Sequence, residues 1–344
     1  MKKINLAIVG VTGAVGQEFL KLIEERNFPF ANLKMLASSR SAGKKINFMG
    51  KEYTVEETTE NSFDGVDIAL FAGGSASKIF APAAVKVGAV VIDNSSTFRM
   101  DPEVPLVVPE VNPQAIFRHK GIIANPNCST IIMVMALKPL YEISKIKRIV
   151  VSTYQAVSGA GREGMEELKT QLDSLAKNEK IEPKILPVAK LDKHFQIASN
   201  LLPQIDVFMD NLYTKEEMKM IDETKKIMED SDMKITATTV RVPVFRSHAE
   251  SVNVEFFDEV SVESAKNALK NFPGVTLTDN PSEMIYPQPL ETSGKDDVEI
   301  GRIRKDFSVD HGLNFWVCGD QIRKGAALNA LQIAEVLIKN SEAD

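Results

Sequence analysis

The fold of this chain is decided by its N-terminal stretch, Ile4-Asn5-Leu6-Ala7-Ile8-Val9-Gly10-Val11-Thr12-Gly13-Ala14-Val15-Gly16. The first six residues form an apolar run typical of a buried strand, and three glycines follow at intervals of three residues. Apolar side chains then recur at helical spacing over residues 17–26. A strand, a glycine-rich turn and a helix in this order are the context of a dinucleotide-binding turn.

Each of the three glycines has a separate expected role in that turn. Gly10 permits the tight turn, Gly13 lets the backbone approach a pyrophosphate, and Gly16 allows the helix to pack closely on the strand. The spacing is G-x-x-G-x-x-G and not the commoner G-x-G-x-x-G, so a plain turn remains the alternative. Its position at the start of the chain and its flanking elements favour the dinucleotide site.

The second expected strand, residues 33–37, ends in a basic, hydroxyl-rich turn, Ser38-Ser39-Arg40-Ser41-Ala42-Gly43-Lys44-Lys45. A site for NAD usually has an acidic residue here, which binds the ribose hydroxyls. Hydroxyl groups and the guanidinium of Arg40 instead suit a 2′-phosphate, which arginine can bind with paired hydrogen bonds. The turn therefore favours NADP over NAD, with a solvated basic turn as the alternative.

The rest of the first half continues to alternate strand and helix. Strands are expected at 66–71 and 89–93, with a helix at 77–87 between them, which predicts a doubly wound parallel sheet. Ligands of such sheets bind beyond the carboxyl ends of the strands, where polar loops fall in this sequence. Arg99, in the loop after residue 93, is a candidate for binding an anionic substrate group; an exposed surface arginine is the alternative.

A cysteine stands where a later helix is expected to begin, in Asn125-Pro126-Asn127-Cys128-Ser129-Thr130. Backbone N–H groups at a helix start have no intrahelical partner, and the helix dipole there favours an anion. Such a position can shift a thiol towards the nucleophilic thiolate. We interpret Cys128 as the catalytic nucleophile; a small buried apolar residue is the alternative.

The second half of the chain has a different pattern. Long strands are expected at 148–157, 235–245 and 249–257, the last two facing each other across residues 246–248, and later strands at 298–303 and 313–318. These predict an antiparallel sheet with helices on one face, and an open face suited to a dimer contact. The last helix, 326–339, is expected to return to the first domain.

Bulk properties limit the class of protein. A length of 344 residues predicts two domains, which we place at 1–127 with 325–344 and at 128–324. The net charge of −6 and the absence of a basic cluster argue against nucleic acid as a partner. Two cysteines, Cys128 and Cys318, are too few for a disulfide framework and fit a reducing cytosol. We expect a soluble cytoplasmic protein with no membrane segment and no metal site.

Four histidines could serve as a base, namely His119, His194, His248 and His311. Sequence spacing does not choose among them, although His248 lies in the expected strand pair that also carries Arg241. On the helix expected after Thr214, two charged residues, Glu216 and Lys219, lie three positions apart on one face. Their simplest interpretation is a solvated ion pair.

Several stretches together resemble the aspartate-β-semialdehyde dehydrogenases, most closely the form found in Gram-positive bacteria. The resemblance covers essentially the whole chain. Besides residues 10–16, 37–44 and 125–130, it is carried by Val107-Val108-Pro109-Glu110-Val111-Asn112, Ser152-Thr153-Tyr154-Gln155-Ala156-Val157-Ser158-Gly159-Ala160-Gly161, Leu202-Pro203-Gln204-Ile205-Asp206, Arg241-Val242-Pro243 and Gly301-Arg302-Ile303-Arg304.

The resemblance implies a Rossmann-type NADP-binding domain and an α+β catalytic and dimerisation domain with a mainly antiparallel sheet, as in glyceraldehyde-3-phosphate dehydrogenase. It implies reduction of L-4-aspartyl phosphate by NADPH to L-aspartate 4-semialdehyde and phosphate, on the route to lysine, methionine and threonine, in a homodimer. The matching family residues imply a thioester on Cys128, acid/base chemistry at His248 and an orienting role for Gln155.

The remaining roles implied by the resemblance concern binding. Arg241 matches the partner of the substrate carboxylate and Glu216 the partner of its amino group, with Glu217 as the other candidate. Arg99, Asn127 and Lys219 match the phosphate-binding groups. The residues that match NADP contacts are Thr12, Gly13, Ala14, Val15, Arg40, Ser41, Ser158, Gly159 and Gln321, the last of which can be asparagine in relatives; Ser39 is a further candidate from the hydroxyl-rich turn itself.

Two other functions remain open at the level of sequence. N-acetyl-glutamyl-phosphate reductase shares the expected fold and cysteine chemistry, so only the substrate pocket separates the two enzymes. A non-catalytic NADP-binding protein is disfavoured, because Cys128, Gln155, Arg241 and His248 are all present.

Overall fold

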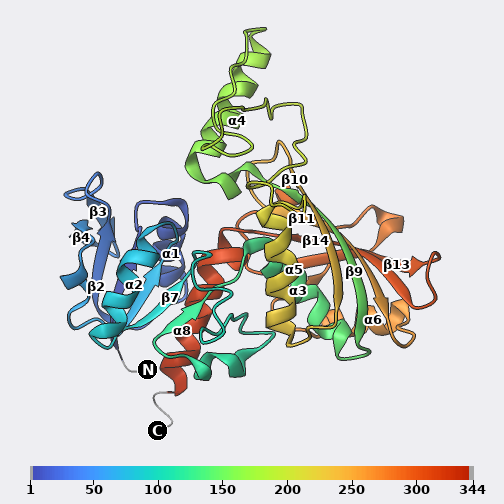
Figure 1. The fold of residues 1–344 in the computed structure, drawn as a ribbon, viewed down its shortest axis with the longest axis horizontal. Coiled ribbons are helices and arrows are strands. Elements are labelled where there is room, and N and C mark those ends of the chain that lie inside the picture. The colour runs from blue at the N-terminus through green and yellow to red at the C-terminus, as the bar shows by residue number, and fades with distance from the viewer. Residues whose placement is uncertain (1–2, 341–344) are drawn as a thin grey trace. The chain divides into compact units, whose positions relative to one another are not determined.

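The structure, a computed structural model, describes residues 3–340 and divides into two compact units (Figure 1). The first unit contains the chain up to Asn127 together with the segment that starts at Ala326. The second unit runs from Cys128 to Gly325.

The first unit is built on a six-stranded sheet in which every pair of neighbours is parallel. The strand order is β5-β2-β1-β6-β7-β8, so the chain winds outwards in both directions from β1. This confirms the predicted doubly wound sheet. The strands are β1 (Ile4–Val9), β2 (Phe30–Ala37), β5 (Glu56–Glu57), β6 (Ile68–Phe71), β7 (Val90–Asp93) and β8 (Ile122–Ala124).

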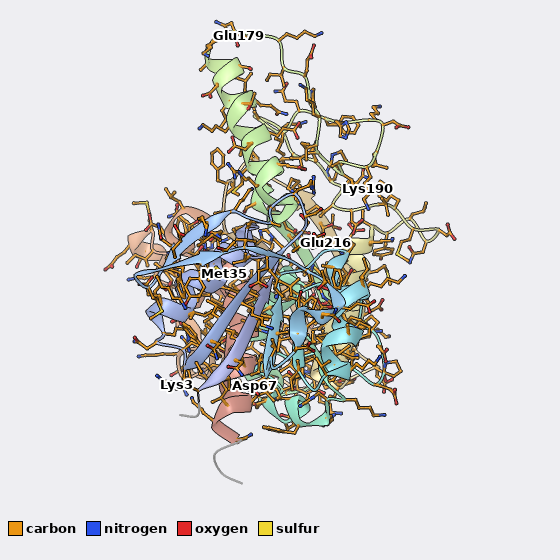
Figure 2. All side chains as sticks on the ribbon, turned by 90° about the vertical axis from the view of Figure 1, so that its left-hand side faces the viewer. Lys3, Met35, Asp67, Glu179, Lys190 and Glu216 are labelled. Atoms are coloured by element: carbon orange, nitrogen blue, oxygen red, sulfur yellow. The ribbon has the colours of Figure 1, made fainter. Side chains whose placement is uncertain are left out.

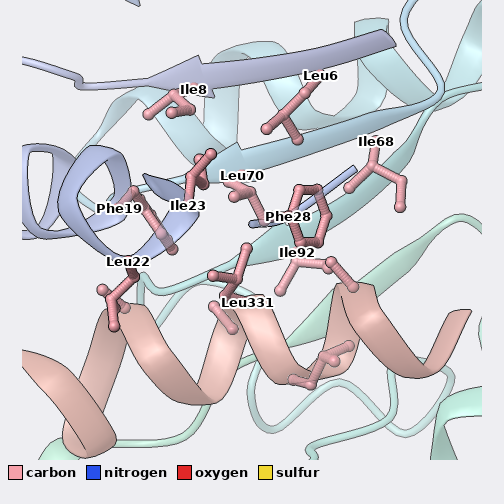
Figure 3. Close-up of a cluster of buried hydrophobic side chains, with 14 of the residues drawn as sticks. Leu6, Ile8, Phe19, Leu22, Ile23, Phe28, Ile68, Leu70, Ile92 and Leu331 are labelled. Atoms are coloured by element: carbon pink, nitrogen blue, oxygen red, sulfur yellow. The ribbon is translucent and has the colours of Figure 1, made fainter. Parts of the chain in front are cut away.

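Helices cover both faces of this sheet because its strands are apolar on both sides. Leu6 and Ile8 pack in one core with α1 (Ala14–Glu25) and α8 (Leu328–Asn340), where Leu331 faces the strands (Figure 3). The alternate residues of β1, Ala7 and Val9, pack in a second core with α2 (Ala76–Lys86). The unit is completed by the hairpin β3 (Lys45–Phe48) and β4 (Lys51–Thr54) and the short helices η1 (Glu60–Phe63) and η2 (Pro113–Arg118).

The second unit has a six-stranded mixed sheet in the order β10-β9-β11-β14-β13-β12. Three of its neighbouring pairs are antiparallel, and the outer pairs β10/β9 and β12/β13 are parallel. Its strands are β9 (Ile146–Gln155), β10 (Lys234–Arg241), β11 (His248–Phe256), β12 (Val275–Leu277), β13 (Val298–Asp306) and β14 (Gly312–Gly319).

The sequence prediction that β10 and β11 face each other as a pair is wrong. β9, which precedes them by about eighty residues along the chain, lies between them and pairs with both. The apolar alternation of each strand shows that it has two different faces, but it does not determine its neighbour. The consequence is that the carboxyl end of β9 meets the end of β10 and the start of β11.

Three helices form one layer on this mixed sheet: α3 (Cys128–Tyr141), α5 (Lys215–Met228) and α6 (Val262–Lys270). Nearly all of α3 is buried, since it packs on β11, β13 and β14 and is flanked by α5 and α6. On the opposite face, the half-buried rings of Tyr154 and Trp316 contact each other at a centroid distance of 5.3 Å. None of the three helices α3, α5 and α6 lies on that face.

A long excursion separates β9 from α5. It starts with η3 (Val157–Ala160) and α4 (Gly161–Ala176) and projects from the sheet, with Glu179 near its far end (Figure 2). A small core that includes Leu168 and Leu186 holds it together. The other elements of this unit are η4 (Pro281–Glu283), α7 (Pro289–Thr292) and a π-helix over Arg323–Ala327, which leads into α8.

Candidate active site

Cys128 is the first residue of α3, as predicted, and its side chain is partly exposed whereas the residues after it are buried. The other cysteine differs: Cys318 is fully buried in β14, and burial raises the pKa of its thiol well above the ordinary value. Only Cys128 is therefore placed to meet a substrate, because Cys318 is neither accessible nor ionised.

Three predicted site residues form one row across the mixed sheet. Gln155 ends β9, Arg241 ends β10 opposite it, and His248 begins β11. In the antiparallel pair of β11 with β9, Ala249 lies opposite Tyr154, so His248 lies opposite Gln155. The sheet thus brings together residues that are up to 93 positions apart in the sequence, and it holds them on strand ends, which are rigid supports.

The main-chain N–H and C=O of one residue, Ala156, orient two of these side chains. The backbone N–H of Ala156 donates to Nδ1 of His248 at 3.1 Å, and its carbonyl accepts a hydrogen bond from Nη1 of Arg241 at 2.8 Å. Gly159 lies close by, where an added Cβ would be 2.6 Å from Nη1 of Arg241 and 3.5 Å from Nε2 of His248. A side chain at residue 159 would fill the space over both groups.

Glu216 joins the row from α5. Its carboxylate accepts from Nε2 of Gln155 at 3.3 Å and from Nζ of Lys219 at 3.1 Å, and Lys219 also donates to Asp206 at 3.0 Å. Glu217 faces elsewhere, since its two oxygens accept from the backbone N–H groups of Thr214 and Thr239. Of the two candidates, Glu216 is therefore the one that lies at the row, and the Glu216/Lys219 pair is buried at its acidic end.

The buried charges of the row shift one another's pKa values. Burial lowers the pKa of the Arg241 guanidinium, while Glu216 and Cys128 favour its charged form. Burial and the nearby Arg241 lower the pKa of His248 to about 3, although Glu216 and the backbone of Ser247 act in the opposite direction. Near neutral pH the site contains a buried cation and a neutral imidazole. Nε of Arg241 is buried with no hydrogen-bond partner among the described residues, as expected for a group that binds an anion.

Gln321 links Ser158 to Ser247, the residue that precedes His248, by hydrogen bonds. The side-chain oxygen of Gln321 accepts from the backbone N–H of Ser247 at 2.8 Å, and its amide nitrogen is hydrogen-bonded to the hydroxyl of Ser158. Gln321 is almost fully buried. The predicted cofactor contacts Ser158 and Gln321 thus also support the strand end that carries the imidazole.

The first unit contains the predicted glycine-rich turn between β1 and α1. Gly10 has a φ of +85°, and a Cβ on Gly16 would lie 2.3 Å from the carbonyl oxygen of Gly10, so that both positions need glycine. α1 begins at Ala14, which directs the N–H groups of its first turn, including that of Val15, towards the loop end of the sheet.

The turn after β2 lies beside the glycine-rich turn. The hydroxyl of Thr12 donates to that of Ser41 at 3.3 Å, and Ser39 and Arg40 are exposed. The two turns predicted to form the dinucleotide site are thus neighbours within one unit.

Arg99 is buried and not exposed on the surface, contrary to the alternative considered from the sequence. Its Nη2 donates to the carbonyl of Asn94 at 2.8 Å, and the loop is held by buried Asp93, which accepts from Ser77 and Ser95. Asn127, the last residue of the first unit before Cys128, is also buried.

Over residues 3–340, no group of acidic, histidine or cysteine side chains is arranged to bind a metal ion. Within the same residues, no helix is both long and apolar enough to cross a membrane.

Comparison with known proteins agrees with this architecture. The model of the semialdehyde dehydrogenase NAD-binding domain matches residues 5–119, and the model of the semialdehyde dehydrogenase dimerisation domain matches residues 137–324. The aspartate-semialdehyde dehydrogenase of Bacillus subtilis is 55% identical over 338 residues, which cover 98% of each chain.

The chain belongs to the aspartate-semialdehyde dehydrogenase family. A crystal structure of aspartate-semialdehyde dehydrogenase II from Vibrio cholerae, complexed with ASA, superimposes with a TM-score of 0.92 at 48% identity, covering 98% of this chain and 99% of that one. The enzyme from Candida albicans, crystallised with NADP, gives a TM-score of 0.74 at 27% identity and covers 98% of each chain.

Within this family framework, sequence reasoning missed several residues at the site. Asp206, which holds Lys219, lies in a matched stretch but carries no signal of its own. The main-chain groups of Ala156 cannot be identified from residue type. Glu250 lies two residues after His248 on β11, fully buried and with no hydrogen-bond partner among the described residues. An acidic residue at an inward position of an alternating strand was the available signal for Glu250.

Proposed function

We propose that this chain is an NADPH-dependent aspartate-semialdehyde dehydrogenase, which reduces L-4-aspartyl phosphate to L-aspartate 4-semialdehyde and phosphate. The observation that carries the proposal is the partly exposed Cys128 at a helix start, in the same unit as the buried row of Gln155, Arg241 and His248. Membership of the family, with relatives of this name over nearly the whole chain, supports it.

In the proposed reaction, the thiolate of Cys128 attacks the acyl carbon of the substrate. The C–O bond to phosphate breaks, phosphate leaves with the electron pair, and a thioester remains. In the second half, the thioester carbon is reduced, the C–S bond breaks, and Cys128 returns as the thiolate. Splitting the reaction in this way replaces one difficult acyl reduction by two easier steps.

The roles of the surrounding side chains follow from their chemistry. The guanidinium of Arg241 has the fork geometry that suits the substrate α-carboxylate, and its free Nε supplies one of the donors. Glu216 supplies the negative charge for the substrate amino group, and Gln155, bonded to Glu216, orients the substrate. Arg99, Asn127 and Lys219 are the proposed phosphate ligands.

The residues of the first unit fit NADP. Close packing at Gly16 and the helix start at Ala14 leave backbone N–H groups for a pyrophosphate, and Ser39, Arg40 and Ser41 suit a 2′-phosphate. Thr12, Gly13 and Val15 are the further proposed contacts in this unit, and Ser158, Gly159 and Gln321 are those in the second unit. Bound NADPH supplies the hydride for the second half of the reaction.

We also propose that the chain acts as a homodimer, because a dimerisation-domain model matches most of the second unit. The sheet face that carries Tyr154 and Trp316 is the proposed contact, since α3, α5 and α6 all pack on the other face.

The reverse reaction tests the proposed activity. With NADP, phosphate and L-aspartate 4-semialdehyde, we expect phosphate-dependent formation of NADPH, and little with N-acetyl-glutamate semialdehyde. The matched assay omits phosphate or replaces NADP by NAD. Activity with only the acetylated five-carbon substrate would overturn the assignment of the substrate.

A further inference from the structure

The start of α3 packs against two glycines at and beyond the end of β14. Cys128 and Ile132 lie four positions apart on α3 and therefore share one face of the helix. An added Cβ on Gly325 would lie 2.9 Å from Cβ of Cys128 and 3.3 Å from its Cα. An added Cβ on Gly319, the last residue of β14, would lie 3.0 Å from Cγ1 of Ile132. Both glycines thus leave just enough room for this face of α3.

The contact with α3, and not the local backbone, restricts these two positions to glycine. Gly294, in the loop before β13, has a left-handed φ of +83°, whereas Gly319 and Gly325 are not among the residues with positive φ. Alanine could therefore adopt the backbone angles of Gly319 and Gly325. The restriction is strictest at Gly325, because the opposing Cα and Cβ of Cys128 belong to a rigid helix and cannot rotate away.

Asp320 holds the segment between the two glycines. Its side chain is fully buried. Its carboxylate accepts hydrogen bonds of 2.6–3.1 Å from Nε of Arg246 and from the backbone N–H groups of Gly294, Ile322 and Arg323. Its main-chain carbonyl accepts a further hydrogen bond, at 3.1 Å, from the N–H of Gly325. Charge-assisted hydrogen bonds of this kind are strong, so Gly325 is held firmly against Cys128.

We propose that Gly319 and Gly325, held by Asp320, form a seat for the start of α3 that fixes the direction of Sγ of Cys128. This inference rests on the proposed function and deepens it, because a nucleophile must be aligned with the carbonyl that it attacks. Gly319 and Gly325 are positioning residues, since they act through Ile132 and Cys128. A misplacement of about 1 Å can lower the rate of a reaction by about 100-fold.

Alkylation of Cys128 by iodoacetamide tests the seat without substrate or cofactor. A Cys318→Ala background leaves Cys128 as the only thiol of the chain. The methyl group of Gly325→Ala would press on Cys128 and cover part of it, so we expect alkylation to be at least about fivefold slower. An alkylation rate equal to that of the parent would overturn the proposal.

Gly312→Ala is the matched control. Gly312 lies at the other end of β14, where an added Cβ would collide with the side chain of Val309. The same substitution in the same strand should therefore lower the urea midpoint of unfolding, but leave the alkylation rate and kcat nearly unchanged. A loss of alkylation in Gly312→Ala as large as in Gly325→Ala would show that the effect comes from general destabilisation, and would overturn the proposal.

A compensating substitution tests the second glycine in the reverse reaction. The methyl group of Gly319→Ala would press on Ile132, and we expect kcat to fall by about 10- to 100-fold while KM for NADP changes by less than about twofold. Ile132→Val removes one carbon at this contact, so the double variant should regain most of kcat. A double variant as slow as Gly319→Ala would overturn the proposal, and so would a change in KM for NADP with kcat unchanged.

The two readouts separate this inference from the proposed function. If the parent showed no phosphate-dependent turnover, the proposed function would fail, and the alkylation rates would still decide whether the seat exists. If turnover were present and the alkylation rate of Gly325→Ala matched that of the parent, only the seat would be rejected. Should Gly325→Ala not fold, alkylation of Gly319→Ala and of its double variant with Ile132→Val decides in the same way.

Discussion

The two units build their candidate sites in different ways. The first unit uses main-chain groups and a few flanking side chains from two adjoining turns, 10–16 and 38–45, at the ends of parallel strands. The second unit uses buried side chains from β9, β10, β11 and α5 on one sheet face, together with Cys128 at the start of α3. The first arrangement suits the recognition of a ligand, and the second suits chemistry on it.

The difference has a physical basis. Backbone N–H groups at a turn are available wherever a helix begins, so a binding site needs only small residues and one cation. Catalysis needs charges with altered properties, which requires burial and mutual support. Arg241, His248, Glu216 and Glu250 are therefore buried together, despite the free-energy cost of removing ionisable groups from water. If this comparison is correct, the two sites can be impaired separately.

The largest effect is expected from Cys128→Ser. The hydroxyl is not ionised at neutral pH, so no thioester forms, and we expect kcat to fall by at least about 10⁴-fold. NADP affinity, measured by fluorescence titration, should change by less than about twofold. Cys318→Ala, at a buried position of β14 in the same unit, is the control and should retain most of kcat. Substantial turnover of the serine variant would reject the thioester mechanism.

A smaller effect is expected from Arg40→Ala in the first unit, and it should fall on NADP binding and not on kcat. Loss of the guanidinium should weaken NADP binding by about 10- to 100-fold, roughly 1.4–2.7 kcal/mol, because a charged hydrogen bond to phosphate is lost. NAD affinity and kcat at saturating NADPH should remain nearly the same. Lys44→Ala removes another exposed cation of the same turn and is the control. If both variants weaken NADP equally, the turn provides only general positive charge.

The two units also differ in how far the sequence predicted them. The main strands and helices of the first unit and both of its turns were predicted, because their signals are local: an apolar run, then glycines, then a helical period. The short elements β5, η1 and η2 were not predicted. In the second unit the five longer strands were predicted and β12 was not, and the predicted pairing of β10 with β11 was wrong. The order of strands in a sheet depends on long-range packing, and no local sequence pattern predicts that order.

The same distinction applies to individual residues. Thr214-Lys215-Glu216-Glu217 has the pattern of a helix capping box, which could have assigned Glu217 to the helix start and left Glu216 for the site. By contrast, the need for glycine at residue 159 arises from Arg241, 82 positions later, and no sequence rule predicts that contact. Residues that act through their neighbours in space were the ones missed.

The smallest expected effect concerns Glu250, the buried acid beside the row. Burial, assisted by the negative charge of Glu216, raises the pKa of its carboxyl well above the ordinary value of 4.5. Above about pH 4.5 the unfolded chain releases a proton that the folded chain keeps, so this group lowers the free energy of unfolding as pH rises. The contribution is at most about 1.4 kcal/mol per pH unit and ends at the pKa of the folded state.

Glu250→Gln removes this titration while keeping the shape of the side chain. We therefore expect the variant to be more stable than the parent at pH 7.5 and the difference to shrink towards pH 4.5, as measured by urea unfolding. Glu263→Gln, on the exposed first turn of α6, is the control and should show no such trend. Greater stability of the parent at pH 7.5 would mean that Glu250 is ionised and paired in the folded protein. The second unit would then contain one fewer buried ionisable group without a partner, and its contrast with the first unit would be weaker.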